Sequence, residues 1–215
     1  MQARIAVCFA VAAMVAATSA RATPVLTFAG GGTANNFNQD VGWQFNVVTA
    51  LRVSDLEWYD SAGTGLSVAH EVGIWSPAGA LLTSALIPAG VAAPLVMGNW
   101  REVQITPIML NPGNGYVVGG LNFDTSTDRV ACANGGICGG PIVLNLNPAL
   151  QFVNGTFSDL NIGFAEPTHF TAAQQGLFGS SFSVAAAAPE PASLALLGGA
   201  LLLGFGVIRR RRNRV

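Results

Sequence analysis

Lysine is absent from this chain of 215 residues, and charged residues of all kinds make up only 10% of it. Seven of the ten basic residues, all of them arginine, lie in the first 21 or the last seven positions. Between residues 23 and 188, three arginines stand against ten acidic side chains, which gives this segment a formal charge of −7. Because it has no basic patch that could release counterions, we expect neither nucleic acid nor an anionic membrane surface as its partner.

Motifs of catalysis are missing as well. No serine lies in a Gly-x-Ser-x-Gly elbow, and no glycine-rich phosphate loop stands between a strand and a helix. His70 lies beside Glu71 on an expected strand with apolar neighbours. A general base or a metal ligand is possible there, but the setting favours a hydrogen-bonded structural histidine. His169 follows Pro167 in a loop and has no evident partner.

Two carboxylates, Asp55 and Glu57, share one face of an expected strand and could mimic the paired acids of a hydrolytic site. Solvation at the surface is the favoured explanation of such a pair, because charged side chains are rarely buried without a partner. We therefore predict no catalytic residue, no cofactor and no enzymatic activity.

Cysteine is scarce, with three in the chain. Cys8 lies in a targeting segment, and Cys132 and Cys138 enclose a small glycine-rich loop. An even pair in an exported chain indicates a disulfide. A free pair and a metal site are the alternatives. The five intervening residues are too many for the usual Cys-x(2–4)-Cys metal pair, and no histidine lies nearby.

Two acidic loops carry a weaker hypothesis of calcium binding. Hard oxygen ligands on turns suit calcium, which takes about six to eight of them. Turn residues that cap their own backbone are the favoured explanation, because neither loop has the spacing of an EF-hand. We expect no bound metal. The residues concerned are Asp60, Ser61 and Thr64 in one loop, and Asp124, Thr125, Ser126 and Asp128 in the other.

The first 22 residues indicate export. A short region with Arg4 precedes an apolar stretch from Ile5 to Ala17, and a polar end closes with Ala20-Arg21-Ala22. Ala20 and Ala22 are the small residues that a signal peptidase reads, so we predict cleavage after Ala22. The apolar stretch is short for a spanning helix, which needs about 17–25 residues. A permanent N-terminal anchor is the alternative.

The segment from residue 23 to residue 185 is expected to be one extracytoplasmic domain. Runs rich in β-branched and aromatic residues alternate with turn-forming clusters of proline and glycine, and no long amphipathic helix interrupts them. This pattern predicts an all-β fold, an antiparallel β-sandwich of jelly-roll type. The expected strands are Gly42–Val48, Leu51–Tyr59, Val68–Trp75, Ala80–Ile87, Trp100–Thr106, Gly115–Leu121, Ile142–Leu146 and Asn161–Ala165.

A spacing within this domain resembles a β-sandwich module of unknown function that recurs in exported bacterial surface proteins. The resemblance covers roughly residues 40–122 and implies a fold rather than an activity. The residues that carry it are Gly42-Trp43-Gln44-Phe45, Val53, Leu56, Tyr59-Asp60, Gly65-Leu66, His70 to Trp75, Gly79, Leu81-Leu82, Trp100-Arg101 and Asn111 to Gly119.

The last 30 residues, 186–215, form a tail of distinct composition. Pro189-Glu190-Pro191 precedes an uncharged apolar run from Ala192 to Ile208, and Arg209, Arg210, Arg211 and Arg212 follow. As a helix the run spans about 25 Å, slightly less than a hydrocarbon core of about 30 Å. We predict a signal helix at the N-terminus and a single transmembrane helix here, with the arginines held in the cytoplasm as a stop signal.

These tail elements resemble the PEP-CTERM sorting signal of Gram-negative bacteria. The resemblance implies that an integral-membrane exosortase recognises Pro189, Glu190 and Pro191 and processes the protein. Members of the family are commonly associated with exopolysaccharide or the biofilm matrix. Ala188 stands where the family often has valine, whereas the other elements are intact. A permanent C-terminal anchor is the alternative.

Together these features predict an exported, non-catalytic protein of the cell surface or biofilm matrix. Its expected partners are the secretion translocon, signal peptidase, an exosortase, the membrane through its tail, and exopolysaccharide. It is expected to sit in the inner membrane with its domain in the periplasm, and to move outward after processing. Trp58, Tyr59, Trp75 or Trp100 could stack on sugar rings, although core positions are the favoured explanation. A carbohydrate-active enzyme and a self-associating adhesive module are the alternative functions.

Overall fold

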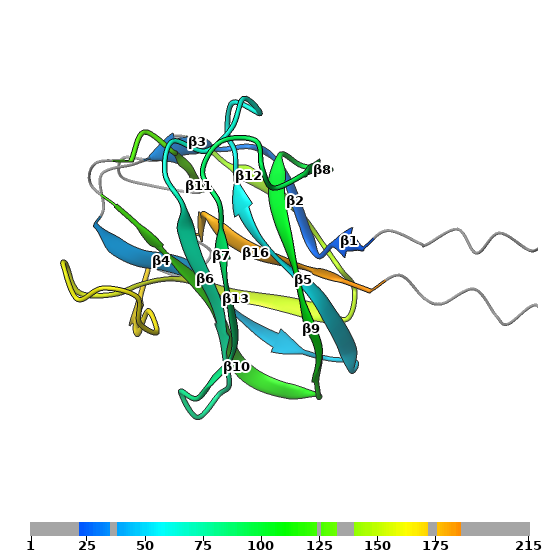
Figure 1. Ribbon diagram of the computed structural model, residues 1–215. Helices are drawn as coiled ribbons and strands as arrows, with labels where there is room; N and C mark the ends of the chain where they lie inside the picture. The colour runs from blue at the N-terminus through cyan, green and yellow to red at the C-terminus, as the bar shows by residue number, and fades with distance from the viewer. Residues whose placement is uncertain (1–21, 35–37, 124–125, 133–139, 172–175, 186–215) are drawn as a thin grey trace, which may run out of the picture.

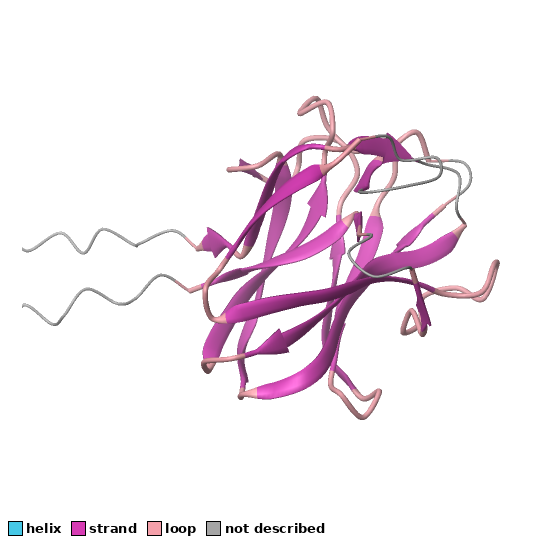
Figure 2. Cartoon of the chain, turned by 180° about the vertical axis from the view of Figure 1, so that it is seen from behind, coloured by secondary structure: helices cyan, strands magenta, loops and turns pink. Residues whose placement is uncertain are grey.

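The computed structural model describes residues 22–34, 38–123, 126–132, 140–171 and 176–185. All regular structure in these ranges is β-strand (Figure 2), and every strand pairing is antiparallel. The prediction of an all-β antiparallel fold is confirmed for this part of the chain. Within it there is no helix of the length and apolarity needed to cross a bilayer. The predicted signal and transmembrane helices lie in residues outside these ranges.

Two larger sheets and two smaller ones make up the domain (Figure 1). The first sheet has the order β1 (Thr23–Pro24), β16 (Ser180–Val184), β5 (Leu51–Tyr59), β9 (Trp100–Leu110), β8 (Leu95–Val96). The second has the order β14 (His169–Phe170), β13 (Leu150–Phe157), β4 (Gln39–Val47), β10 (Gly113–Asn122), β6 (His70–Trp75), β7 (Leu81–Ile87). The small sheets are β15 (Leu177–Phe178), β11 (Val130–Cys132), β3 (Gly32–Ala34), and β12 (Ile142–Leu146), β2 (Leu26–Gly30).

Aromatic side chains join the two larger sheets. Trp43 of β4 stacks on Phe182 of β16 with ring centroids 6.1 Å apart, and its indole N–H donates to the carbonyl oxygen of Ser180 at 3.0 Å. Trp58 of β5 stacks on the ring of His70 of β6 at 3.9 Å. These side chains are fully buried, so the alternation that predicts the strands also supplies a sandwich core.

Most predicted strands are present, with shifted ends. Leu51–Tyr59 and Ile142–Leu146 have the predicted bounds. The prediction of a strand at Asn161–Ala165 is wrong. Asn161 has φ of 63°, which breaks extended backbone, and this segment is a loop. Sequence analysis missed β13 and β16, because β16 is rich in serine and β13 mixes polar and apolar residues without clean alternation.

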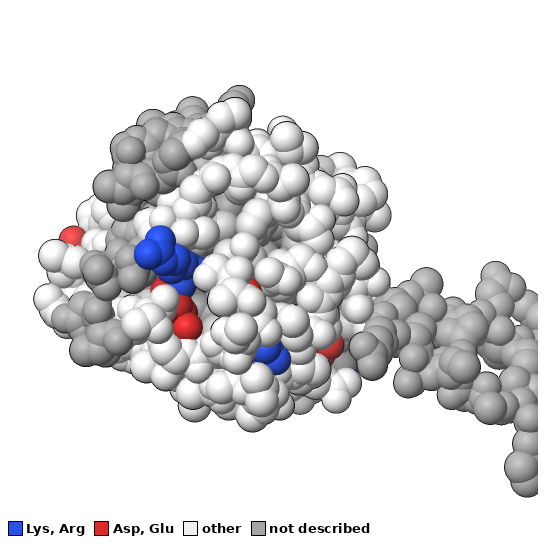
Figure 3. Space-filling view, turned by 90° about the horizontal axis from the view of Figure 1, so that it is seen from above, with Lys and Arg blue, Asp and Glu red and all other residues white. Residues whose placement is uncertain are grey.

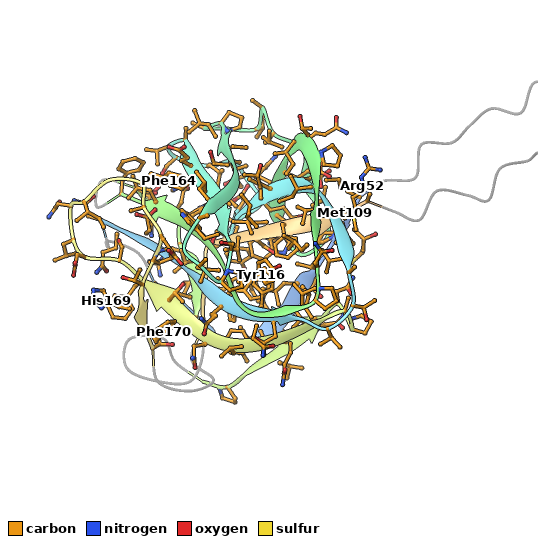
Figure 4. All side chains as sticks on the ribbon, turned by 90° about the horizontal axis from the view of Figure 1, so that it is seen from below. Arg52, Met109, Tyr116, Phe164, His169 and Phe170 are labelled. Atoms are coloured by element: carbon orange, nitrogen blue, oxygen red, sulfur yellow. The ribbon has the colours of Figure 1, made fainter. Side chains whose placement is uncertain are left out.

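The two ends of the described domain lie side by side. Thr23, the first residue of β1, pairs with Val184, the last residue of β16, so the chain enters and leaves the domain on the same side (Figure 1). In Figure 4, Arg52 and Met109 lie on that side, whereas Phe164, His169 and Phe170 lie across the domain from them. On the face shown in Figure 3, charged side chains are few and most of the surface is uncharged, in line with the composition.

Candidate functional site

A distortion in the first sheet forms the most distinctive polar site. Along β16, Ser183 faces Asp55 and the next residue, Val184, faces Val53, so Ser54 is an extra residue in β5. Along β9, the partners of Val53 and Asp55 are Ile108 and Gln104, four positions apart. Such bulges redirect side chains and often accompany functional sites.

Pro107 lies inside this irregular part of β9, where its missing N–H removes no regular ladder bond. Because of the bulge, the neighbours Ser54 and Asp55 both line one cavity instead of facing opposite sides of the sheet. We call it the bulge cavity. Its volume is about 620 Å³, and it is lined by Ala22, Arg52, Ser54, Asp55, Pro88, Ala92, Ala93, Pro94, Glu102, Val103, Gln104, Pro107 and Ala185.

Two buried polar groups in the bulge cavity have no partner of their own. Ser54 is 6% exposed, and its hydroxyl makes no hydrogen bond. Asp55 is 7% exposed, and its carboxylate makes no hydrogen bond or ion pair within the described ranges. Buried polar groups are normally satisfied, and each exception calls for an explanation. The cavity is therefore a candidate binding site.

Glu57 lies in the same strand, two residues after Asp55, and is fully buried. It faces Ser181 on one side and Glu102 on the other, and it accepts a hydrogen bond from the hydroxyl of Ser183. Burial, reinforced by the charges of Glu102 and Asp55, raises the pKa of Glu57 to about 8 despite that hydrogen bond. Glu57 is thus a neutral acid at pH 7. The interpretation of Asp55 and Glu57 as solvated surface residues is wrong, because other segments of the same chain cover both residues.

The raised pKa of buried Glu57 predicts that the stability of the fold falls as the pH rises from about 4 to about 8. Burial also raises the pKa of Asp40 to about 7, so from about pH 4 to about pH 8 the folded state holds protons that the unfolded chain releases. We expect the melting temperature to be higher at about pH 5 than at about pH 8, by about 5 °C or more. Glu57→Gln should reduce this slope and stabilise the protein at the higher pH. Thermal melts across this range test it; an unchanged slope in Glu57→Gln would contradict it, and the exposed Asp159→Asn serves as control.

A second polar cluster joins the start of β6 to Asp128, which lies just before β11. His70 is fully buried; its Nδ1 lies 2.9 Å from the carbonyl oxygen of Leu121, and its Nε2 lies 2.9 Å from Asp128 Oδ2. Asp128 also accepts bonds from the N–H groups of Ser67 and Val68 and from the hydroxyls of Ser67 and Ser126.

Asp128 is an ionised partner in this cluster. Burial alone would raise its pKa, but the hydrogen bonds from His70, Ser67 and Val68 lower the pKa to about 2. Both ring nitrogens of His70 have partners within the protein, so neither is open to a substrate or a metal. The prediction of a hydrogen-bonded structural histidine agrees with this geometry. For His169 the expectation is wrong: its Nε2 lies 3.0 Å from Asp159 Oδ1.

The loop that begins at Asp60 is held by the protein itself. Asp60 Oδ1 and Oδ2 accept bonds from the N–H groups of Gly63 and Gly65, and Arg101 Nε donates to Oδ2 at 2.9 Å. Arg101 also bonds the carbonyl oxygens of Ala93 and Gly63. This arrangement is the backbone capping that the sequence favoured over calcium. In the described ranges, no group of three or more His, Cys, Asp or Glu is placed to hold a metal.

The tryptophans predicted as sugar-stacking candidates all lie in the interior. Trp58 and Trp100 are 0% exposed and Trp75 is 4% exposed, while Tyr59 packs on Phe28 and Trp100. The indole N–H of Trp100 donates to the carbonyl oxygen of Leu26 at 2.8 Å. The three tryptophans therefore occupy core positions, the favoured explanation, whereas Tyr59 is half-buried.

Several predicted site residues fall outside the described ranges: Ala20, Asp124, Thr125, Cys138, Pro189, Glu190, Pro191, Arg209, Arg210, Arg211 and Arg212. Ala22 is described and lies at the rim of the bulge cavity, directly before β1. Cys132 is buried in β11 and is disulfide-bonded. Its pairing with Cys138 stays a prediction.

Sequence analysis missed Ser54, Glu102, Gln104 and Arg52 as members of one site. Their common feature is the double irregularity of β5 and β9, which a linear sequence shows only through Pro107 in an otherwise strand-like run. A proline in such a run indicates an edge strand or a bulge. That signal could have located the cavity but not the side chains that line it.

One protein-family model matches part of this chain. The model of a domain of unknown function, DUF4082, matches residues 30–136, about half of the chain. This fits the predicted resemblance to a module of unknown function. No curated protein and no solved structure matches. The matched segment ends before β13 and β16, so each larger sheet also contains strands from outside it. The match does not reach the tail, whose identification stays a prediction.

Proposed function

We propose that this protein is an exported, non-catalytic component of the cell surface or biofilm matrix, sorted by an exosortase through residues 186–215. The observation that carries the proposal is the order of the tail: Pro189-Glu190-Pro191, an uncharged apolar run and a cluster of arginines. The described domain supports it in one respect. Its last strand ends at Val184, five residues before Pro189, so a folded domain would stand close to a membrane-embedded tail.

The sorting step predicts a specific covalent change. In a host that contains an exosortase, the mature protein should lack the arginines at 209–212, because processing separates them from the domain. Glu190→Ala should retain them, and Ser193→Ala, two residues after the tripeptide, should behave like the unaltered chain. Mass spectrometry of the C-terminal peptide measures this. Arginines still attached to the unaltered chain in that host would overturn the proposal.

We further propose that the domain contacts exopolysaccharide through polar side chains. The bulge cavity supports this, since it offers carboxylate, amide, hydroxyl and guanidinium groups over a volume of about 620 Å³. Co-sedimentation of the full chain, in detergent, with matrix polysaccharide from its host tests the contact. Sedimentation of the chain by itself without any polysaccharide contact would instead favour the adhesive module.

One observation favours a carbohydrate-active enzyme as a second candidate. Burial raises the pKa of Glu57 to about 8, and Glu57 lies near the carboxyl groups of Asp55 and Glu102; a protonated acid beside a second carboxyl group is the arrangement of glycoside hydrolysis. Glu57 is nevertheless fully buried and does not line the bulge cavity, so it has no direct access to a ligand there. Sugar turnover that is lost in Glu57→Gln or Asp55→Asn would favour the enzyme over the binding protein.

A further inference from the structure

We infer that the bulge cavity binds an aliphatic ammonium group carried on a hydroxyl-bearing skeleton, the chemistry of an amino sugar with a free amine. The inference rests on the function proposed above, because it names the kind of saccharide unit that the exported domain contacts.

The ammonium part follows from a carboxyl group that lines the cavity without a partner from the protein. Asp55 is 7% exposed, lines the cavity and makes no hydrogen bond or ion pair within the described ranges. The carboxylate oxygens of Asp55 are not among the fully buried unpartnered oxygens, so they open on the cavity, where a cation that enters can pair with them. Glu102 lines the same cavity, whereas Arg52, the cationic residue of the lining, is exposed. Cations are therefore preferred over anions.

The hydroxyl part follows from the neutral polar groups. The hydroxyl of Ser54 is buried without a partner, and Gln104 presents an exposed amide at the cavity. Hydroxyl and amide groups both donate and accept hydrogen bonds, which matches ligand hydroxyls rather than an alkyl chain. The remaining wall is aliphatic and includes Pro88, Pro94 and Pro107. Among the described residues that line the cavity there is no aromatic side chain, so they do not offer a stacking surface for flat aromatic ligands.

An organic cation suits the site better than a metal ion. Calcium requires about six to eight oxygen ligands. Asp55 and Glu102 supply the carboxylates of this lining, and no group of three or more His, Cys, Asp or Glu in the described ranges is placed to hold a metal. The cavity volume of about 620 Å³ also lies within the range of sites that hold small organic molecules, about 300–1,000 Å³.

The test is calorimetric titration of the full chain in detergent at about pH 6, where the amine of the ligand is protonated. The probes are a glucosamine tetramer, its N-acetylated counterpart, glucosamine monomer, and a linear polyamine without hydroxyls. We expect the free-amine tetramer to bind about tenfold or more tightly than the acetylated one. The monomer shows whether one residue suffices or the polymer is needed.

Asp55→Asn should weaken binding of the free-amine tetramer by about tenfold or more, and Ser54→Ala by a smaller factor. Asp159→Asn, a change of the same type on an exposed loop, should leave it unchanged. Asp55 makes no hydrogen bond or ion pair within the described ranges, so Asp55→Asn should leave the melting temperature close to that of the unaltered protein. Loss of binding is thereby separated from loss of folding.

Equal binding of the two tetramers, or full binding by Asp55→Asn, would overturn the inference while leaving a polysaccharide contact in place. A polyamine that binds as tightly as the glucosamine tetramer would overturn its hydroxyl part. If neither tetramer binds but matrix polysaccharide does, the inference fails and the proposed contact stands. If no saccharide of any kind binds, both fail.

Discussion

Asp128→Asn is expected to lower the free energy of unfolding by about 3–5 kcal/mol, which corresponds to roughly 10 °C in melting temperature. Asp128 Oδ2 is the acceptor for His70 Nε2 at 2.9 Å, and His70 is fully buried. An amide in its place removes the negatively charged acceptor beside the buried ring of His70. It also turns an NH₂ group toward donors such as the hydroxyl of Ser67. Urea denaturation of both proteins near neutral pH measures the change.

The pH dependence provides a second readout for this variant. The pKa of Asp128 is lowered to about 2, so its contribution is present above about pH 4 and is lost as the pH falls toward 2. Asp128→Asn should remove that part of the acid destabilisation. Asp159→Asn, which breaks an exposed pair with His169, should cost less than about 1 kcal/mol. A loss from Asp128→Asn no greater than this would contradict the role given to the cluster.

Gly42→Ala is expected to have an equally large or larger effect, because β4 and β10 approach closely at this residue. A Cβ atom on Gly42 would lie 1.9 Å from the carbonyl oxygen of Val118 and 2.7 Å from the Cα of Gly119. Both obstacles are backbone in the middle of the six-stranded sheet, so the strands would have to separate. We expect a loss of about 3 kcal/mol or more, with poor yield of folded protein.

Gly140→Ala is the matched control for this substitution. Gly140 has open space around the position of a Cβ atom, and its φ is not in the left-handed region. Its replacement should change stability by less than about 1 kcal/mol, with stabilisation as the expected sign. Circular dichroism and denaturant unfolding of the two variants compare them directly. A Gly42→Ala variant as stable as Gly140→Ala would contradict the close packing of β4 and β10.

The sequence predicts strands well where side chains alternate. In β4, Trp43, Phe45 and Val47 point to one face and are all buried, and the prediction located this strand within a few residues. In β16, Phe182 is the buried aromatic residue that packs in the core. It is surrounded by serines, so β16 shows no clear alternation of apolar and polar residues. The loop at residues 161–165 is the opposite case: Ile162 is apolar but 53% exposed, so hydrophobicity alone misleads there.

The candidate site was less predictable than the fold. Asp55 and Glu57 could be identified as a pair from their spacing in β5, but not whether they are solvated. Asp55 lies in a cavity whose lining includes residues 88 and 92–94 and the ends at residues 22 and 185, and Glu57 pairs with β16 and β9; all of these lie far away in the sequence. His70 and Asp128 are likewise 58 residues apart, and no local spacing connects them.

The sequence by itself determined the all-β class, the acidic and lysine-free character of the domain, and the prediction of its export and sorting. These properties depend on composition and local periodicity, which are encoded along the chain. The tertiary structure decided which polar groups are buried and which of them meet. Ser54 and Asp55 share a cavity only because β5 and β9 lose register at the same point, and such long-range pairing has no local signal in the sequence.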